Sequence, residues 1–217
     1  MKEHTTVKTD ISMKLCILLS VFAGLLVGMN LLGGKIIGLF GVSVSVGIFM
    51  VPFTFLITDI VAEVYGKKMA QKFLVAGVFT LCVILMYTAI FVLLEPHARY
   101  ETNNEYRTIF GASLRILIAS IVAFVLSQFH DIWAFEFWRA QTKGKALWLR
   151  NNASTAVSQA IDTLIFMFIA FYMITPQFNA MFIIQLAIPF YLFKVAFAIL
   201  DTPLVYAGVR WLKEKSA

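Results

Sequence analysis

The sequence has 217 residues, of which 60% are apolar and only 14% charged. Soluble proteins are roughly half apolar and a quarter charged, so these values exclude an ordinary soluble domain, a disordered chain and a disulfide-stapled scaffold. The excess of apolar side chains must face lipid. The net charge of +6 does not indicate nucleic-acid binding, because the cations lie between apolar segments, as the basic loops of membrane proteins do.

Six apolar stretches are long enough to cross a bilayer, which takes about 20 residues in a helix. They cover residues 13–33, 44–64, 70–94, 111–131, 151–174 and 182–208. The sequence therefore predicts an all-α integral membrane protein with six transmembrane helices, forming a single transmembrane domain over residues 1–217. Residues 1–12 and 209–217 are expected to be cytoplasmic tails.

The distribution of Lys and Arg sets the predicted orientation. If the N-terminus is inside, the outer segments hold only Lys35, Arg99 and Arg107. The inner segments then hold Lys2, Lys8, Lys14, Lys67, Lys68, Lys72, Arg139, Lys143, Lys145, Arg150, Arg210, Lys213 and Lys215. Cytoplasmic loops carry such an excess of basic residues, so both termini should be cytoplasmic. The four Trp residues also map near that boundary, as an aromatic belt would.

A glycine-rich stretch joins the first two spans and contains the alternating segment Val42-Ser43-Val44-Ser45-Val46. This pattern suits broken or re-entrant backbone, and two interpretations stay open: the lining of a cavity mouth, or a long loop before a frayed helix. In the first span, Gly24 and Gly28 allow close helix packing. We place packing within the chain ahead of a homodimer.

The fifth span carries a stripe of polar side chains that ends in a carboxylate. Asp162 lies about 18 Å along a helix from Arg150, close to the middle of the bilayer. The other members of the stripe are Asn151, Asn152, Ser154, Thr155, Ser158 and Gln159. Such residues can simply bond neighbouring helices, but a whole stripe with an acid in the membrane favours a polar cavity.

The fourth span offers a second polar face, made of Ser120, Ser127, Gln128 and Asp131. The pattern Ser127-Gln128-x-x-Asp131 reappears as Ser158-Gln159-x-x-Asp162, and both a duplication and chance remain open. We expect this face to meet the fifth span, with His130 pointing away from it. Arg115 should extend to the lipid headgroups.

Three more charged residues lie within or at the ends of spans: Asp59 in the second, Lys194 and Asp201 in the sixth. Lys194 needs a carboxylate from another helix, and Asp162 is the first candidate because both lie near mid-depth. A structural ion pair and a substrate contact are equally open. His and Cys residues show no metal-ligand spacing, so no metal or cofactor is expected.

Four segments give the chain a resemblance to a known family. They are Phe53-Thr54-Phe55-Leu56-Ile57-Thr58-Asp59 with Tyr65-Gly66, Ser127-Gln128-Phe129-His130-Asp131, Asn152-Ala153-Ser154-Thr155 leading to Ser158-Gln159-Ala160-Ile161-Asp162-Thr163, and Phe193-Lys194-Val195. In these the sequence resembles the queuosine precursor transporters, six-span proteins also called vitamin uptake transporters. The resemblance implies import of 7-deazaguanine precursors of queuosine across a bacterial inner membrane.

The residue types suit such a substrate. A 7-deazaguanine presents N–H donors that a carboxylate can accept, while its carbonyl needs an amide or ammonium donor. The primary candidates are Asp162, Gln159 and Lys194. The wider candidate set for substrate binding adds Asn152, Ser158, Asp59, Gln128, Asp131 and Asp201. An aromatic ring should stack on the base, but the sequence does not single one out.

Two rival functions were weighed. The chain could be the substrate-capturing membrane subunit of a multi-subunit ATP-driven vitamin importer. It could also be an intramembrane aspartyl protease using Asp59 and Asp162, which is disfavoured because no Gly-x-Gly-Asp segment accompanies either acid. We therefore expect a transporter and not an enzyme. The identity of the precursor, the energy coupling and the oligomeric state stay open.

Overall fold

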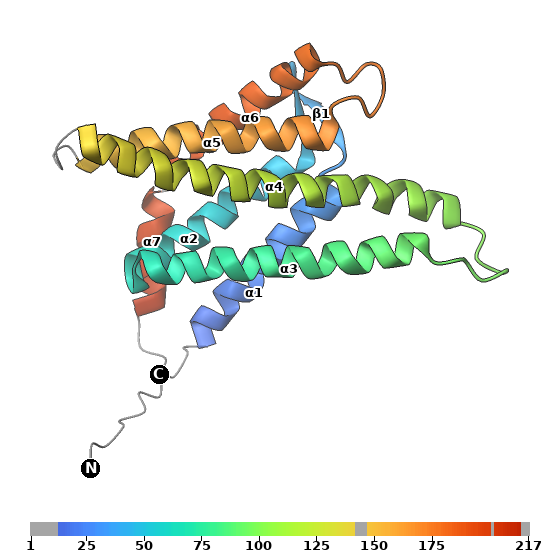
Figure 1. Ribbon diagram of the computed structural model, residues 1–217. Coiled ribbons are helices and arrows are strands. Elements are labelled where there is room, and N and C mark those ends of the chain that lie inside the picture. The colour runs from blue at the N-terminus through green and yellow to red at the C-terminus, as the bar shows by residue number, and fades with distance from the viewer. Residues whose placement is uncertain (1–12, 142–146, 201, 214–217) are drawn as a thin grey trace.

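The computed structural model describes residues 13–141, 147–200 and 202–213 (Figure 1). Helices dominate it, as the sequence predicts. The elements in chain order are α1 (Met13–Leu32), β1 (Ile36–Leu39), β2 (Val42–Ser45), the 3-10 helix η1 (Val46–Phe49), α2 (Val51–Tyr65), α3 (Lys67–Leu93), α4 (Asn103–Gln141), α5 (Leu147–Phe171), α6 (Ala180–Leu200) and α7 (Thr202–Lys213).

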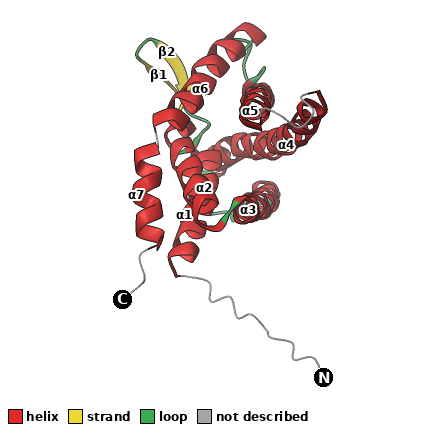
Figure 2. Ribbon diagram, turned by 90° about the vertical axis from the view of Figure 1, so that its left-hand side faces the viewer, coloured by secondary structure: helices red, strands yellow, loops and turns green. Residues whose placement is uncertain are grey.

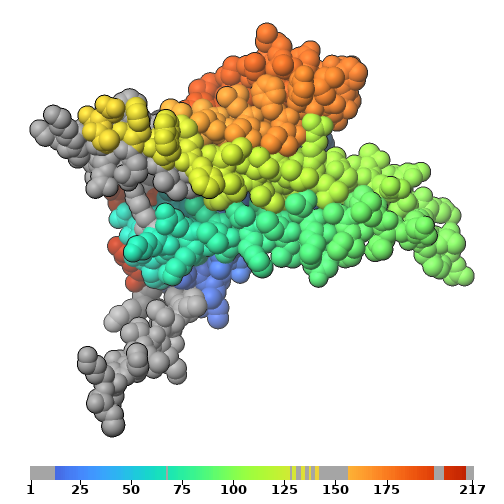
Figure 3. Space-filling model, viewed as in Figure 1, coloured from blue at the N-terminus to red at the C-terminus, as the bar shows by residue number. Residues whose placement is uncertain are grey.

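Three long helices, α3, α4 and α5, run nearly parallel or antiparallel to one another, while α1, α2 and α6 cross them at a tilt (Figures 1 and 2). In the space-filling view, α3 and α4 form one continuous surface, and the turn that joins them projects beyond the neighbouring helices (Figure 3).

Five helical segments are long and apolar enough to cross a membrane within the described residues. They are Met13–Leu32, Val46–Tyr65, Lys68–Leu93, Asn103–Ser127 and Ala180–Phe197, with a shorter apolar segment at Ala156–Phe171. The chain is therefore a multi-pass membrane protein. Their outward faces carry exposed apolar side chains such as Val75 and Phe79, which a bilayer would cover.

The sixth predicted span, residues 182–208, is wrong as a single helix. The structure ends α6 at Leu200 and begins α7 at Thr202. Pro203 explains the break, because its nitrogen has no hydrogen to donate and its ring would clash with the carbonyl of Ile199 in a continuous helix. Residues 209–213, expected in a tail, belong to α7.

The segment between α1 and α2 is an antiparallel hairpin, which an all-helical prediction lacks. Its register pairs Ile36 with Ser45 and Leu39 with Val42, and the Val/Ser alternation matches the two-residue period of a strand. The turn residues Phe40 and Gly41 both have positive φ, 48° and 81°, as tight two-residue hairpin turns require. The backbone N–H and C=O groups of this non-helical segment are therefore hydrogen-bonded between the two strands, as a membrane environment requires.

Two apolar clusters hold the bundle together. The larger joins the hairpin and η1 to α4, α5 and α6, and includes Val44, Ile48 and Phe171; the smaller joins α1, α2 and α3 around Phe22 and Val61. Residues of both clusters, among them Phe22 and Phe190, also line the cavity described below.

Candidate functional site

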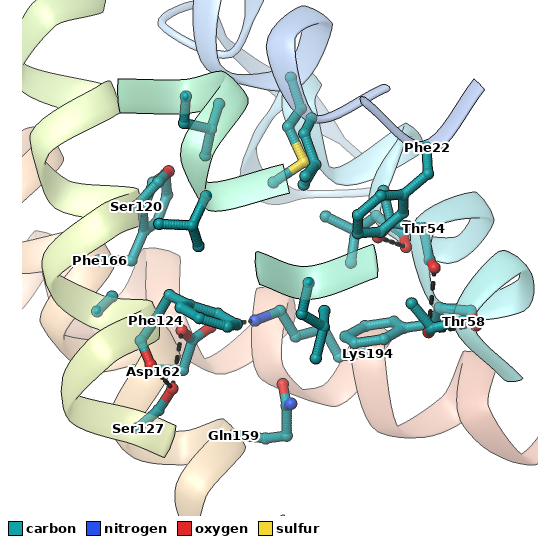
Figure 4. A pocket seen from close by; sticks show the side chains of 18 of the residues that line it. Phe22, Thr54, Thr58, Ser120, Phe124, Ser127, Gln159, Asp162, Phe166 and Lys194 are labelled. Carbon is teal, nitrogen blue, oxygen red and sulfur yellow. Dashed lines mark hydrogen bonds and ion pairs between the residues drawn. The ribbon is translucent and has the colours of Figure 1, made fainter. Parts of the chain in front are cut away.

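A cavity of about 260 Å³ lies between the two halves of the bundle (Figure 4). Its volume is near the lower end of the roughly 300–1,000 Å³ typical of small-molecule sites. The lining comes from six helices: Phe22, Leu26 and Met29; Val51, Thr54, Phe55 and Thr58; Leu74, Val78 and Leu81; Ser120, Ala123, Phe124 and Ser127; Gln159, Asp162 and Phe166; Phe190 and Lys194. Most of the wall is apolar; the charged and amide groups come from α5 and α6, and the hydroxyl groups from α2 and α4.

The ion pair between Asp162 and Lys194 is the electrostatic centre of the cavity. Lys194 Nζ lies 2.9 Å from Asp162 Oδ2 and 3.2 Å from Thr163 Oγ1, so it connects α6 to α5. Only 9% of the Lys194 side chain and 24% of the Asp162 side chain are exposed. The prediction that Asp162 is the counter-ion of Lys194 is confirmed.

Gln159 places a buried acceptor next to this pair. Its side-chain Oε1 accepts no hydrogen bond from any residue that the structure describes. It lies one helical turn before Asp162, and Figure 4 shows both side chains turned toward the cavity. A buried carbonyl left unpaired costs about 1–3 kcal/mol, so this atom suits a ligand that brings an N–H donor.

The hydroxyl groups in the wall satisfy their own hydrogens on nearby groups. Ser127 Oγ donates to the Phe124 carbonyl at 3.0 Å and lies 3.5 Å from Asp162 Oδ1. Thr54 and Thr58 donate to carbonyls of their own helix. Each hydroxyl keeps lone pairs that can accept a hydrogen bond from a molecule in the cavity.

Ser120 is the exception, because it bonds to a side chain on another helix. Its hydroxyl donates to Oδ1 of Asn30, which is only 1% exposed and itself donates to the Leu26 carbonyl. These bonds fasten α1 to α4 beside the cavity.

Aromatic rings supply flat apolar walls. Phe190 is buried, and Lys194 Nζ lies 5.5 Å from its ring centroid, within the range of a cation–π contact. Phe166 stacks against Phe190 with centroids 6.4 Å apart and planes at 28°. The Phe190 ring therefore lines the cavity and also contacts the ammonium group of Lys194.

The structure brings together three of the candidate residues, Asp162, Gln159 and Lys194, on one cavity wall. Ser158 is instead buried against α4, with its Oγ 3.0 Å from His130 Nδ1. Asp59 is exposed and follows Thr58, which does line the cavity. The side chains of Gln128, Asp131 and Asn152, and Asp201 as a whole, lie outside the described residues.

Two side chains point where the sequence did not predict. His130 was expected to lie outside the polar arc of the fourth span, and from there it contacts Ser158 on α5. Arg115 does not extend to the headgroups alone: its guanidinium donates to the Ile169 and Tyr172 carbonyls, where α5 ends. Carbonyls at a helix end lack intrahelical partners and attract a cation, which explains this position.

Several residues that line the cavity were not predicted from the sequence. Thr54 and Thr58 are four apart and so share a helix face, a signal that could have found them. The cavity phenylalanines give no such signal among 21 Phe residues. Within the described ranges, no group of three His, Cys, Asp or Glu side chains could hold a metal ion.

Comparison with known proteins relates this chain to transporters. Residues 45–208 match the family model described as "Putative vitamin uptake transporter". A Bacillus subtilis (strain 168) protein described as "Probable queuosine precursor transporter" is 34% identical over 184 residues, 84% of this chain and 79% of its own length. The Escherichia coli (strain K12) "Queuosine precursor transporter" is 28% identical over 163 residues, 75% and 71% of the two chains. No solved structure matches.

Proposed function

Because this chain belongs to the family of queuosine precursor transporters, also described as vitamin uptake transporters, we propose that it imports a 7-deazaguanine precursor of queuosine across the bacterial inner membrane. Membership makes it a membrane transporter of a small molecule rather than an enzyme. The observation that carries the proposal is the cavity in which Asp162, Lys194 and Gln159 meet.

Hydrogen-bond chemistry supports this substrate. The carboxylate of Asp162 accepts from the N1–H and the 2-amino group of the base, which lie side by side. Gln159 Oε1, which has no partner among the described residues, accepts the second hydrogen of the same amino group. The ammonium of Lys194 donates to the carbonyl of the base, and Phe190 offers its face to the ring.

The remaining candidate residues belong to the same proposal, and some of them have an indirect role. Ser158 affects the site indirectly, through its contact with His130. Asp59 also affects it indirectly, through α2, whose Thr58 lines the cavity. Gln128, Asp131, Asn152 and Asp201, which lie outside the described residues or side chains, stay proposed as substrate-binding residues. Replacing each with an apolar residue of similar size tests its contribution to uptake.

In the proposed topology, α5 is counted as a sixth crossing and both termini are cytoplasmic. Lys14 Nζ bonds to the Trp211 carbonyl at 2.7 Å, so the described ends of the chain lie together. The same end of the bundle carries Lys68 and Lys72, in keeping with the excess of basic residues on cytoplasmic faces.

We propose a self-sufficient carrier that exposes the cavity to each face in turn and needs no bound cofactor or nucleic acid. The rival is a capture subunit of an ATP-driven importer. Purified protein in liposomes separates the two, because a self-sufficient carrier accumulates labelled base inside them, whereas a capture subunit only binds it.

The central experiment is uptake by cells that lack both their own transporter and precursor synthesis. Queuosine in their tRNA should appear when this chain is expressed and precursor is supplied, and should be lost with Asp162→Ala. Ser20→Ala is the matched control, because Ser20 is exposed on α1 and bonds only within its helix among the described contacts. Undiminished uptake with Asp162→Ala would remove the assignment of the site.

A further inference from the structure

Helix α7 lies across the end of the bundle instead of continuing through it. It runs vertically in both ribbon views, whereas α3 and α5 run horizontally in Figure 1 and are seen end-on in Figure 2. With 12 residues, α7 is about 18 Å long, too short to cross a bilayer. If α3 and α5 follow the membrane normal, α7 lies in the plane of the membrane.

One side of α7 packs on the protein. Leu212 is buried, and Gly208 approaches α2 so closely that an added Cβ would lie 2.2 Å from Ile60 Cδ1. At the end of the helix, Lys14 Nζ bonds to the Trp211 carbonyl and lies 5.3 Å from the Trp211 ring centroid. These contacts fix the rotation of α7 about its own axis.

The rest of the helix surface divides into two flanks of different chemistry. At 100° per residue, Leu204 and Trp211 share the flank on one side of the packed face, and they are 50% and 40% exposed. The opposite flank carries Tyr206, 74% exposed, with the cations Arg210 and Lys213. One flank is therefore apolar and the other polar and basic.

We propose that α7 is an interfacial helix that binds the surface of the membrane leaflet, with Leu204 and Trp211 among the acyl chains and Arg210 and Lys213 at anionic lipid headgroups. A three-way division into protein, apolar and cationic sides is what an in-plane helix at the edge of a bundle needs. The exposed Lys68 and Lys72 at the start of α3 add positive charge at this end, partly offset by the exposed Asp59 and Glu63 of α2. Anionic lipids complement that balance.

The contact would connect the lipid surface to the cavity wall. Gly208 packs against Ile60 of α2, and the same helix supplies Thr54, Phe55 and Thr58 to the cavity. The proposal does not depend on the identity of the substrate.

Fluorescence of Trp211 tests the position of α7 in the full-length protein. Trp133, Trp138 and Trp148 are replaced by Phe, and the protein is reconstituted in phosphatidylcholine vesicles. Lipids brominated near the headgroup should quench Trp211 more than lipids brominated near the chain ends, and iodide in the water should quench it weakly. Strong iodide quenching without quenching by brominated lipid would overturn the proposal.

Two matched pairs test the flanks. Leu204→Asp should lower quenching by brominated lipid, while Tyr206→Asp on the opposite flank should leave it unchanged. Adding phosphatidylglycerol should shift Trp211 emission to shorter wavelength, and Arg210→Gln with Lys213→Gln should abolish that shift, whereas Arg99→Gln with Arg107→Gln should not.

A second copy of the chain is the alternative occupant of this surface. Cross-linking between chains through Tyr206→Cys in dilute vesicles, together with the absence of lipid quenching, would identify a protein interface and overturn the proposal. An equal effect on the emission shift from the Arg210/Lys213 and the Arg99/Arg107 substitutions would likewise show that α7 has no special contact with anionic lipid.

Discussion

Lys194 on α6 and Asp162 on α5 form an ion pair of 2.9 Å whose charges lie inside a cavity in a membrane-spanning bundle. Each charge would be strongly destabilising alone in lipid, so the pair makes the site possible. The bond joins α5 to α6, and among the described side chains Asp162 Oδ1 keeps only a 3.5 Å contact to Ser127. The same two residues therefore hold the helices together and present an acceptor to the cavity.

Removing one member of this pair should destabilise the protein. Lys194→Met or Asp162→Leu alone should lower the free energy of unfolding by about 3–5 kcal/mol, because the remaining charge is buried without a partner. The measurement is denaturant unfolding of purified protein in detergent.

The double variant distinguishes the two roles of the pair. Asp162→Leu combined with Lys194→Met should recover most of the stability, since replacing both charges by apolar groups is often neutral, but uptake should stay lost. Recovered uptake in the double variant would mean that the pair is purely structural.

Gln159 should act on binding and not on stability. Gln159→Leu removes an acceptor that has no partner among the described residues, so unfolding should be unchanged or slightly harder. Binding of a base with a 2-amino group should weaken by about 1–3 kcal/mol, roughly 5- to 150-fold. Titration calorimetry with the base and with an analogue lacking that amine measures the effect.

The analogue gives this prediction its control. Both proteins should bind the base without the amine equally, because Gln159 has nothing to accept from it. Gln185→Leu is the matched variant, since Gln185 is an exposed glutamine on α6. An equal loss for both bases would show that Gln159 does not contact the amine.

The sequence could predict the helices and the ion pair because both follow from the cost of polar groups in lipid. A carboxylate and an ammonium at similar depth must find oppositely charged partners, and the sequence offers Asp162 and Lys194 few other possible partners. The apolar pattern, by contrast, continues through residue 208, so hydropathy does not reveal that the chain turns near Pro203. That turn depends on local backbone chemistry, which a window of about 20 residues averages away.

Side-chain direction was harder to predict than helix position. His130 lies outside the arc that Ser120, Ser127 and Asp131 define on α4, yet it reaches Ser158. Long antiparallel helices such as α4 and α5 meet over a wider arc than their polar stripe covers. The choice of Phe190 over other phenylalanines depends on packing between distant segments, for which the sequence carries no periodic signal.

Phe190 should contribute stacking energy to substrate binding. Phe190→Leu should weaken binding of the base by about 1–3 kcal/mol, the range for a base on an aromatic platform, and Phe190→Tyr should retain most of the affinity. Phe79→Leu serves as the control, because Phe79 is 71% exposed on the outer face of α3. Equal affinities for the Phe190→Leu variant and the parent protein would show that another ring stacks on the substrate.

The close approach of α7 to α2 should make Gly208 sensitive to a single methyl group. An added Cβ would lie 2.2 Å from Ile60 Cδ1 and 2.8 Å from its Cγ1, so Gly208→Ala should destabilise the protein by about 1–3 kcal/mol through overpacking. Gly24→Ala is the matched control, because nothing lies within 4 Å of a Cβ there, and helix propensity should make it neutral or slightly stabilising. Combining Gly208→Ala with Ile60→Ala should cost less than the two single losses added together, since the smaller side chain frees the space that the methyl group fills. Additive losses of unfolding free energy would contradict direct packing of α7 on α2. They would also contradict the proposed connection from the membrane surface through α7 and α2 to the cavity wall.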